Sequence, residues 1–207
     1  MRKTLALLLL AGPAWAQGSP PELDRLLRDP HHREAVLATA RQEDAGVVGA
    51  CPTASIQAGE EVTILQPVQF DSGGKPTAGA WRERLTVLGC GRTRVLNVLT
   101  VVRPLGQLAT GPLLAGTTHA DPVLQRDTVR IAFAAAAATF AGCPDPAIID
   151  TRYVGLEAPP DPTLSAARQT PPWREDWTLR GCNKEVVLPL HFLPDATGTS
   201  VRASPPP

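Results

Sequence analysis

The chain has 207 residues, with 20 basic and 20 acidic side chains and a formal net charge of zero. That length forms one or two small domains, and the balanced charge excludes the basic stripe with which proteins bind nucleic acid or anionic lipid. Aromatic residues make up only 4 % of the chain, whereas Pro (22) and Gly (17) are frequent. We therefore expect a core of Val, Leu, Ile and Ala with long irregular connections.

The N-terminus has the pattern of a secretory signal peptide. Arg2 and Lys3 are followed by an apolar run over residues 5–10 and by a small-x-small site at 14–16. This run is too short to span a bilayer. We predict a signal peptide over residues 1–16, cleaved near Ala16, and a flank over 17–28. The mature chain would be a periplasmic or secreted bacterial protein without a membrane span.

One segment of the sequence occurs twice, displaced by 92 positions (143 − 51). The repeated motifs are Cys51-Pro52 and Cys143-Pro144, Trp81-Arg82-Glu83 and Trp173-Arg174-Glu175, and Gly89-Cys90 and Gly181-Cys182. We predict two tandem repeats over residues 29–106 and 121–198, joined by a linker over 107–120. Residues 199–207 are predicted to be a disordered tail.

Each repeat is expected to begin with a helix. Asp29-Pro30 and Asp121-Pro122 combine an N-cap carboxylate with a proline that has no N–H to leave unpaired. The predicted helices cover residues 30–50 and 122–142, and each ends before a Cys-Pro pair, because proline cannot continue a helix.

The rest of each repeat has the alternation of strands. Extended segments over 56–64 and 148–156 precede polar loops over 71–80 and 159–172, and hairpins over 81–102 and 173–193 follow. The predicted fold is α+β: two tandem helix–strand–loop–β-hairpin repeats, packed pseudo-symmetrically, with antiparallel sheets covered by helices. Since a unit of about 80 residues buries its own core only marginally, we expect the repeats to pack together, and three strands from each could share one six-stranded sheet.

The four cysteines indicate a disulfide-stapled protein in an oxidising compartment. All three possible pairings respect the repeat. We favour Cys51–Cys90 and Cys143–Cys182, because each pair keeps one repeat self-contained. Zinc is disfavoured, since no two cysteines have the close spacing of a structural zinc site.

Glu83 and Glu175 are the charged residues on a strand face that is otherwise apolar. A carboxyl group between Trp and Leu favours the protonated form that a general acid requires. The preferred interpretation is structural: each Glu pairs with an Arg on a neighbouring strand, or lies where the face is partly solvated. Trp173 and Trp177 share that face. They could form an aromatic binding platform, although core packing under a helix is the favoured interpretation.

The favoured function is a non-catalytic binding or interaction module of the bacterial envelope. Its ligand, a protein or small molecule, would contact the cleft between the repeats or the loops 71–80 and 159–172. No metal or cofactor is predicted, because the His residues have no H-E-x-x-H spacing. One alternative is an inhibitor of a secreted hydrolase that uses a Pro-rich loop as a wedge.

The other alternative is a small periplasmic enzyme in which Glu175 and His191 form an acid–base pair. A hairpin turn centred near residue 183 would place these two residues opposite each other. The first repeat has Leu99 at the position of His191, which excludes a pair common to both repeats.

Overall fold

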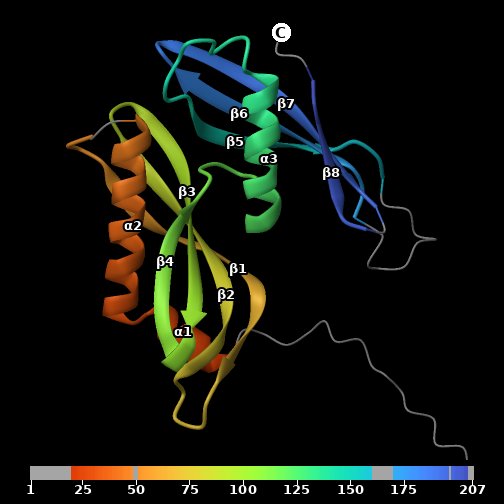
Figure 1. Ribbon diagram of the computed structural model, residues 1–207. Coiled ribbons are helices and arrows are strands. Elements are labelled where there is room, and N and C mark those ends of the chain that lie inside the picture. Colours follow the sequence, from red (N-terminus) through yellow and green to blue (C-terminus); the bar gives the residue numbers. More distant parts are fainter. Residues whose placement is uncertain (1–19, 49–50, 160–169, 196, 205–207) are drawn as a thin grey trace, which may run out of the picture.

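The computed structural model describes residues 20–48, 51–159, 170–195 and 197–204. The predicted signal peptide and its cleavage near Ala16 lie outside the described residues. The described part is α+β and mostly strand: three α-helices and two separate four-stranded antiparallel sheets. Figure 1 shows α2 alongside the first sheet and α3 across the second.

What we call the first unit consists of α2 and the first sheet. Helix α1 (Pro21–Leu27) precedes it. Its elements are α2 (Pro30–Val48), β1 (Ser55–Phe70), β2 (Pro76–Gly89), β3 (Arg92–Arg103) and β4 (Gln107–Leu113), with a 3₁₀ turn (Pro104–Gly106) before β4. The strands lie in the order β1-β2-β3-β4, each antiparallel to the next, so that the sheet is a simple meander.

The second unit consists of α3 and the second sheet. Its elements are α3 (Pro122–Ala135), β5 (Ala147–Leu156), β6 (Trp173–Gly181), β7 (Lys184–Pro194) and β8 (Thr199–Ala203). These strands form a second antiparallel meander in the order β5-β6-β7-β8.

Both predicted helix starts are confirmed. The Asp29 carboxylate accepts from the backbone N–H groups of residues 31 and 32 at 2.9 and 3.0 Å. The Asp121 carboxylate accepts from those of residues 123 and 124 at 2.8 and 2.9 Å. These bonds satisfy backbone donors that have no partner within the helix.

Helix α3 ends at Ala135, earlier than the predicted end at residue 142. Turns follow through residue 142. The Phe140 side chain lies in the core of the second unit, and Cys143 is held by its disulfide. These two anchors require the chain to leave the helical path, despite the helix-favouring alanines.

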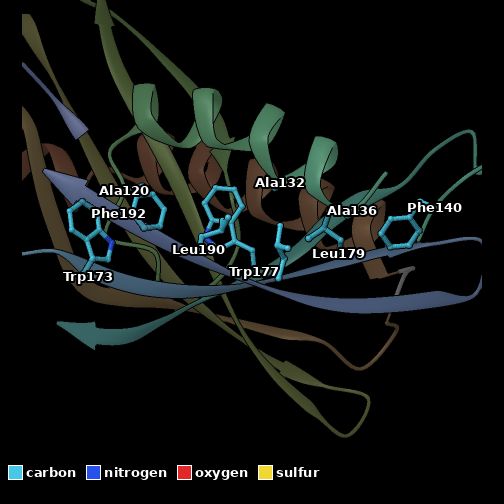
Figure 2. Close-up of a cluster of buried hydrophobic side chains, with 10 residues drawn as sticks. Ala120, Ala132, Ala136, Phe140, Trp173, Trp177, Leu179, Leu190 and Phe192 are labelled. Carbon is cyan, nitrogen blue, oxygen red and sulfur yellow. The ribbon is translucent and has the colours of Figure 1, made fainter. Parts of the chain in front are cut away.

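Each unit has its own hydrophobic core between its helix and one face of its sheet. In the first unit, Val36 and Ala40 of α2 pack against Leu85, Leu96 and Val98. The second core is larger, and Figure 2 shows its side chains between α3 and the strands beneath. It contains Ala120, Ala132, Ala136, Phe140, Trp173, Trp177, Leu179, Leu188, Leu190 and Phe192.

Two disulfides join Cys51 to Cys90 and Cys143 to Cys182, with Cα–Cα distances of 6.1 and 5.8 Å. This is the favoured pairing. Each bond ties the segment before the first strand of a sheet to the turn between its second and third strands.

The two units do not share one six-stranded sheet, an arrangement that the sequence left open. Each sheet has a fourth strand of its own: β4 lies within the predicted linker 107–120, and β8 occupies residues 199–203 of the predicted tail. The sequence Gln-Leu-Ala-Thr-Gly-Pro-Leu of β4 contains Gly and Pro, which are depleted in strands. Edge position tolerates them, since one side of an edge strand needs no ladder partner.

A junction segment, residues 114–120, connects the units. On one side, Asn97 of β3 donates from Nδ2 to the carbonyls of Leu114 and Gly116, at 2.8 and 2.9 Å. On the other side, the backbone N–H of Thr117 donates to the Thr151 carbonyl of β5 at 2.6 Å. The junction segment is therefore hydrogen-bonded to both sheets and fixes one against the other.

Candidate ligand-binding cleft

A cavity of about 380 Å³ lies between the two units, where the start of β3 and the junction segment face β5 and the end of β6. Four arginines line it: Arg92 and Arg94 of the first unit, and Arg152 and Arg180 of the second. Arg92 and Arg94 are two positions apart on β3, so both side chains leave the same face of the strand. The concentration of guanidinium groups identifies this cleft as the leading candidate site.

Three of the four arginines already have acidic partners. Arg94 pairs with Asp44 of α2 and also donates to the Ile149 carbonyl of β5 at 3.1 Å. Arg152 pairs with Asp176. Arg180 donates twice to Glu185, at 3.0 and 3.1 Å.

Arg92 is exposed and has no ionic partner among the described residues. A guanidinium has five N–H donors, so the paired arginines also keep donors that their partners do not use. The cleft thus has capacity for a further acceptor group.

Asp150 of β5 is the acidic residue in the cleft lining. Burial raises the pKa of its carboxyl above the ordinary value of 3.8, while the Thr151 backbone N–H and the charges of Arg94 and Arg152 act in the opposite direction. The raised pKa means that burial weighs more than the two cations. A ligand in this cleft would therefore meet guanidinium donors beside a carboxyl group that resists ionisation.

Glu175, Trp173 and Trp177, three of the predicted site residues, lie together in the core of the second unit. The Glu175 carboxylate is fully buried. It accepts from both indole N–H groups, at 2.9 and 2.8 Å, and from the backbone N–H of His119 at 2.8 Å. Among the described residues, no arginine pairs with Glu175, and its full burial also excludes the partly solvated position that was the other interpretation. Since both tryptophans are buried under α3, they do not form an exposed aromatic platform.

Glu83 has a related arrangement in the first unit. Its Oε1 lies 2.9 Å from the Trp81 indole N–H and 2.7 Å from Nε2 of His32. The predicted arginine partner is again absent from the described contacts of this carboxylate. The His32 side chain comes from the first turn of α2 and is almost completely buried. The contact therefore ties helix α2 to strand β2.

His191 does not meet Glu175, so the structure does not bring together the acid–base pair of the enzyme alternative. In the β6–β7 register, His191 is opposite Arg174, and Glu175 is opposite Leu190. Because neighbouring residues of a strand point to opposite faces, Glu175 lies in the core and His191 on the outer face. Instead, His191 contacts Glu157 and Ser204.

His119, in the junction segment, stacks on Tyr153 of β5, with 3.7 Å between ring centroids and an interplanar angle of 6°. Burial lowers the pKa of His119 below its ordinary value of 6.5. The Glu175 charge opposes this change, and the charges of Arg82 and Arg84 add to it. Burial thus favours the neutral form of this imidazole over the charged form.

The structure describes the first of the two predicted contact loops, 71–80, and only the ends of the second, 159–172. The first is shorter than expected, because β2 already begins at Pro76 and only residues 71–75 separate it from β1. Asp71 orders this turn by accepting from the backbone N–H groups of Gly73 and Lys75, both at 2.9 Å. Most of the second loop, residues 160–169, lies outside the described residues.

Among the residues described, no three His, Cys, Asp or Glu side chains gather as metal ligands would. No helix in the described ranges has both the length and the apolar character needed to cross a membrane. Comparisons with protein-family models, with curated proteins and with solved structures found no match to this chain.

The arginines of the cleft were not predicted from the sequence. A signal was present, because Arg92 and Arg94 on one strand, and Asp150 and Arg152 on another, have the two-residue spacing of a common face, although a bulge shifts the register near Asp150. The sequence does not reveal which of these faces meets the other unit. That depends on the junction segment.

Proposed function

We propose that this protein is an exported binding module of the bacterial envelope, and that the cleft between its units is a non-catalytic site that holds an anionic group of a ligand or partner. The observation that supports binding of an anion is the group of four arginines around one cavity of about 380 Å³. Carboxylate and phosphate groups match the planar donor fork of arginine.

The export part of the proposal is supported by the two disulfides, which suggest an oxidising compartment. A signal peptide over residues 1–16 would direct the chain there, and the periplasm is such a compartment. N-terminal sequencing of the protein recovered from the periplasm tests this, with a mature start just after Ala16 expected.

We further propose that the two units arose by tandem duplication. The offset of 92 recurs between the starts of α2 and α3 (122 − 30), of β1 and β5 (147 − 55), of β3 and β7 (184 − 92) and of β4 and β8 (199 − 107). In both units a Trp indole donates to the Glu two residues later. An experimental structure whose units do not superpose at this offset would contradict the proposal.

The binding proposal is tested by calorimetric titration with inorganic phosphate and with citrate at low salt. Arg92→Gln should weaken binding about tenfold, since one charge-assisted hydrogen bond contributes about 1.5 kcal/mol. Arg92 suits this test because no ion pair within the described residues depends on it. The matched control is Arg130→Gln, which removes an exposed arginine of α3 that does not line the cleft.

Equal affinities of the wild type and Arg92→Gln would reject the cleft as the anion site. Weakening of binding by both variants to the same extent would indicate a nonspecific charge effect and would also reject it.

A further inference from the structure

Three side chains form a hydrogen-bonded row on the outer face of the second sheet. His191 Nδ1 lies 2.6 Å from Oε1 of Glu157, and His191 Nε2 lies 3.0 Å from Oγ of Ser204. Both the His191 and the Glu157 side chains are 31 % exposed. The row is therefore hydrogen-bonded at both ring nitrogens and still accessible to a solute.

The backbone positions each member of the row. His191 belongs to β7. Ser204 follows β8 directly, and its backbone N–H donates to the Pro189 carbonyl at 2.9 Å, which continues the β7–β8 pairing by one residue. Glu157 follows β5 directly, and its N–H donates to the Pro172 carbonyl at 2.7 Å. All three side chains are thus attached to the sheet framework.

The donor and acceptor roles in these two hydrogen bonds depend on the tautomer of His191, and a neighbouring carboxylate favours one of the tautomers. An ionised carboxylate can only accept, so the proton between Glu157 and His191 belongs to Nδ1. In the neutral imidazole, Nε2 then carries the lone pair, and the Ser204 hydroxyl must be the donor. This is the direction in which a histidine takes a proton from a serine nucleophile while a carboxylate holds the ring.

We propose that Ser204 is a nucleophile for acyl transfer, with His191 as its general base and Glu157 as a positioning residue. As Oγ bonds to the carbonyl carbon of an ester, its proton passes to Nε2. The C–O bond to the alcohol then breaks, and the leaving oxygen takes that proton. Water, deprotonated by His191, releases the acyl group as a carboxylic acid and restores Ser204. The net reaction is ester plus water to acid plus alcohol.

Two cations suggest the substrate class. Arg174 of β6 and Arg202 of β8 are the cross-strand partners of His191 on its two sides, so both side chains leave the same face of the sheet. Arg174 pairs with Asp176, whereas Arg202 is exposed and has no ionic partner among the described residues. An ester that carries a separate carboxylate fits this face better than a neutral ester does.

The probe is the 4-nitrophenyl half-ester of suberic acid, with 4-nitrophenyl octanoate as the neutral ester of equal chain length. The full mature chain should release nitrophenol from the anionic ester faster, and peptide mass spectrometry should find the acyl group on Ser204. Ser204→Ala should abolish this acylation, and His191→Gln should slow it by about 10²- to 10⁴-fold. Ser200→Ala, which removes another β8 hydroxyl, should change neither result.

The test of Glu157 must distinguish a positioning role in the reaction from a role in stability alone. Glu157→Gln keeps an acceptor for the Nδ1 proton but removes the charge, so the rate should fall and the pH–rate profile should move to lower pH. Glu157→Asp should recover part of both changes. Arg202→Gln should reduce the preference for the anionic ester.

The proposal is overturned if the acyl group is found on another residue, or if Ser204→Ala reacts as fast as the wild type. Labelling of the wild type with diisopropyl fluorophosphate gives a reading that depends on no variant and on no variant's folding. Absence of the phosphoryl adduct from the Ser204 peptide also overturns it. The Arg92→Gln cleft variant should acylate normally, which separates this proposal from the cleft proposal.

Discussion

Glu175 and Glu83 both lie two residues after a tryptophan, but different numbers of donors face them. Glu175 is fully buried and uses both carboxylate oxygens to accept from three N–H groups. Glu83 is 15 % exposed, and the hydrogen bonds that its side chain forms within the described residues both fall on Oε1. A glutamine side chain can therefore preserve the hydrogen bonds at Glu83, but it cannot preserve those at Glu175.

We therefore predict that Glu175→Gln lowers the free energy of unfolding by about 2–4 kcal/mol. The NH₂ group of the glutamine must face at least one of the N–H donors, and neither of these two donor groups then has an acceptor. Glu83→Gln should lower the free energy of unfolding by only about 1 kcal/mol, because the amide oxygen can replace Oε1 while the NH₂ group turns toward solvent. Urea denaturation of both variants gives the comparison. Equal losses would mean that the donor count at Glu175 does not set its contribution.

The stability of the protein should depend on pH through His119. Because burial lowers its folded pKa below 6.5, the unfolded chain binds more protons between the folded pKa and 6.5. The stability contribution of the neutral ring is complete above pH 6.5, and it is lost as the pH falls through that window. Urea unfolding at several pH values should show that the free energy of unfolding rises with pH across this window.

The matched variant is His119→Phe, which keeps an aromatic ring against Tyr153 but cannot titrate. Its stability should depend less on pH over the same window, while the other three histidines contribute equally to both proteins. A wild-type slope that the substitution leaves unchanged would assign the pH dependence to those histidines.

At the scale of elements, the junction segment depends on one glycine. Gly116 has φ of 101°, and a Cβ built there would lie 1.9 Å from the Thr151 carbonyl oxygen of β5. A side chain would therefore both strain the backbone and separate the segment from β5.

We predict that Gly116→Ala lowers the free energy of unfolding by at least about 2 kcal/mol. The control is Gly111→Ala in β4, where no heavy atom lies within 4 Å of the added Cβ and φ is not in the left-handed region. Gly111→Ala should leave the free energy of unfolding almost unchanged. Thermal unfolding of the two variants measures the difference, and a neutral Gly116→Ala would show that the close approach to β5 relaxes without cost.

The sequence predicted those elements whose signals are local. Asp29-Pro30 and Asp121-Pro122 specify helix starts through donors only two or three residues away. The β6–β7 register was missed by one residue because Cys182 and Asn183 both have positive φ, of 48° and 61°. Such a two-residue turn pairs Gly181 with Lys184. It therefore moves the centre of the hairpin by half a residue from the assumed position.

Contacts between distant segments could not be predicted in the same way. Arg94 meets Asp44 and Ile149, which lie 50 and 55 positions away along the chain. The row of Glu157, His191 and Ser204 spans three segments whose proximity depends on β8, a strand in the part of the chain that was predicted to be a disordered tail. Both candidate sites arise from the packing of strands whose partners no local pattern specified.

At the scale of the whole molecule, the two units have separate cores but share bonded connections. Arg94 of the first unit has one partner in α2 and one in β5, and the junction segment is hydrogen-bonded to both sheets. Separation of the units would break the Arg94–Ile149 hydrogen bond and the bonds of the junction segment to one of the sheets, at a cost of about 1–3 kcal/mol for each buried group left without a partner. We therefore expect the units to unfold together.

Removal of one disulfide tests this coupling. Each disulfide spans 39 positions, and a loop of that length contributes about 4 kcal/mol in the chain-entropy model. In Cys143→Ala/Cys182→Ala, the bond is lost only from the second unit. Hydrogen exchange should nevertheless show reduced protection in β2–β3 as well as in β6–β7, because a coupled first unit opens with the second. Loss of protection confined to β6–β7 in the disulfide variant would instead make the units independent, and the cleft between them would then be a flexible joint.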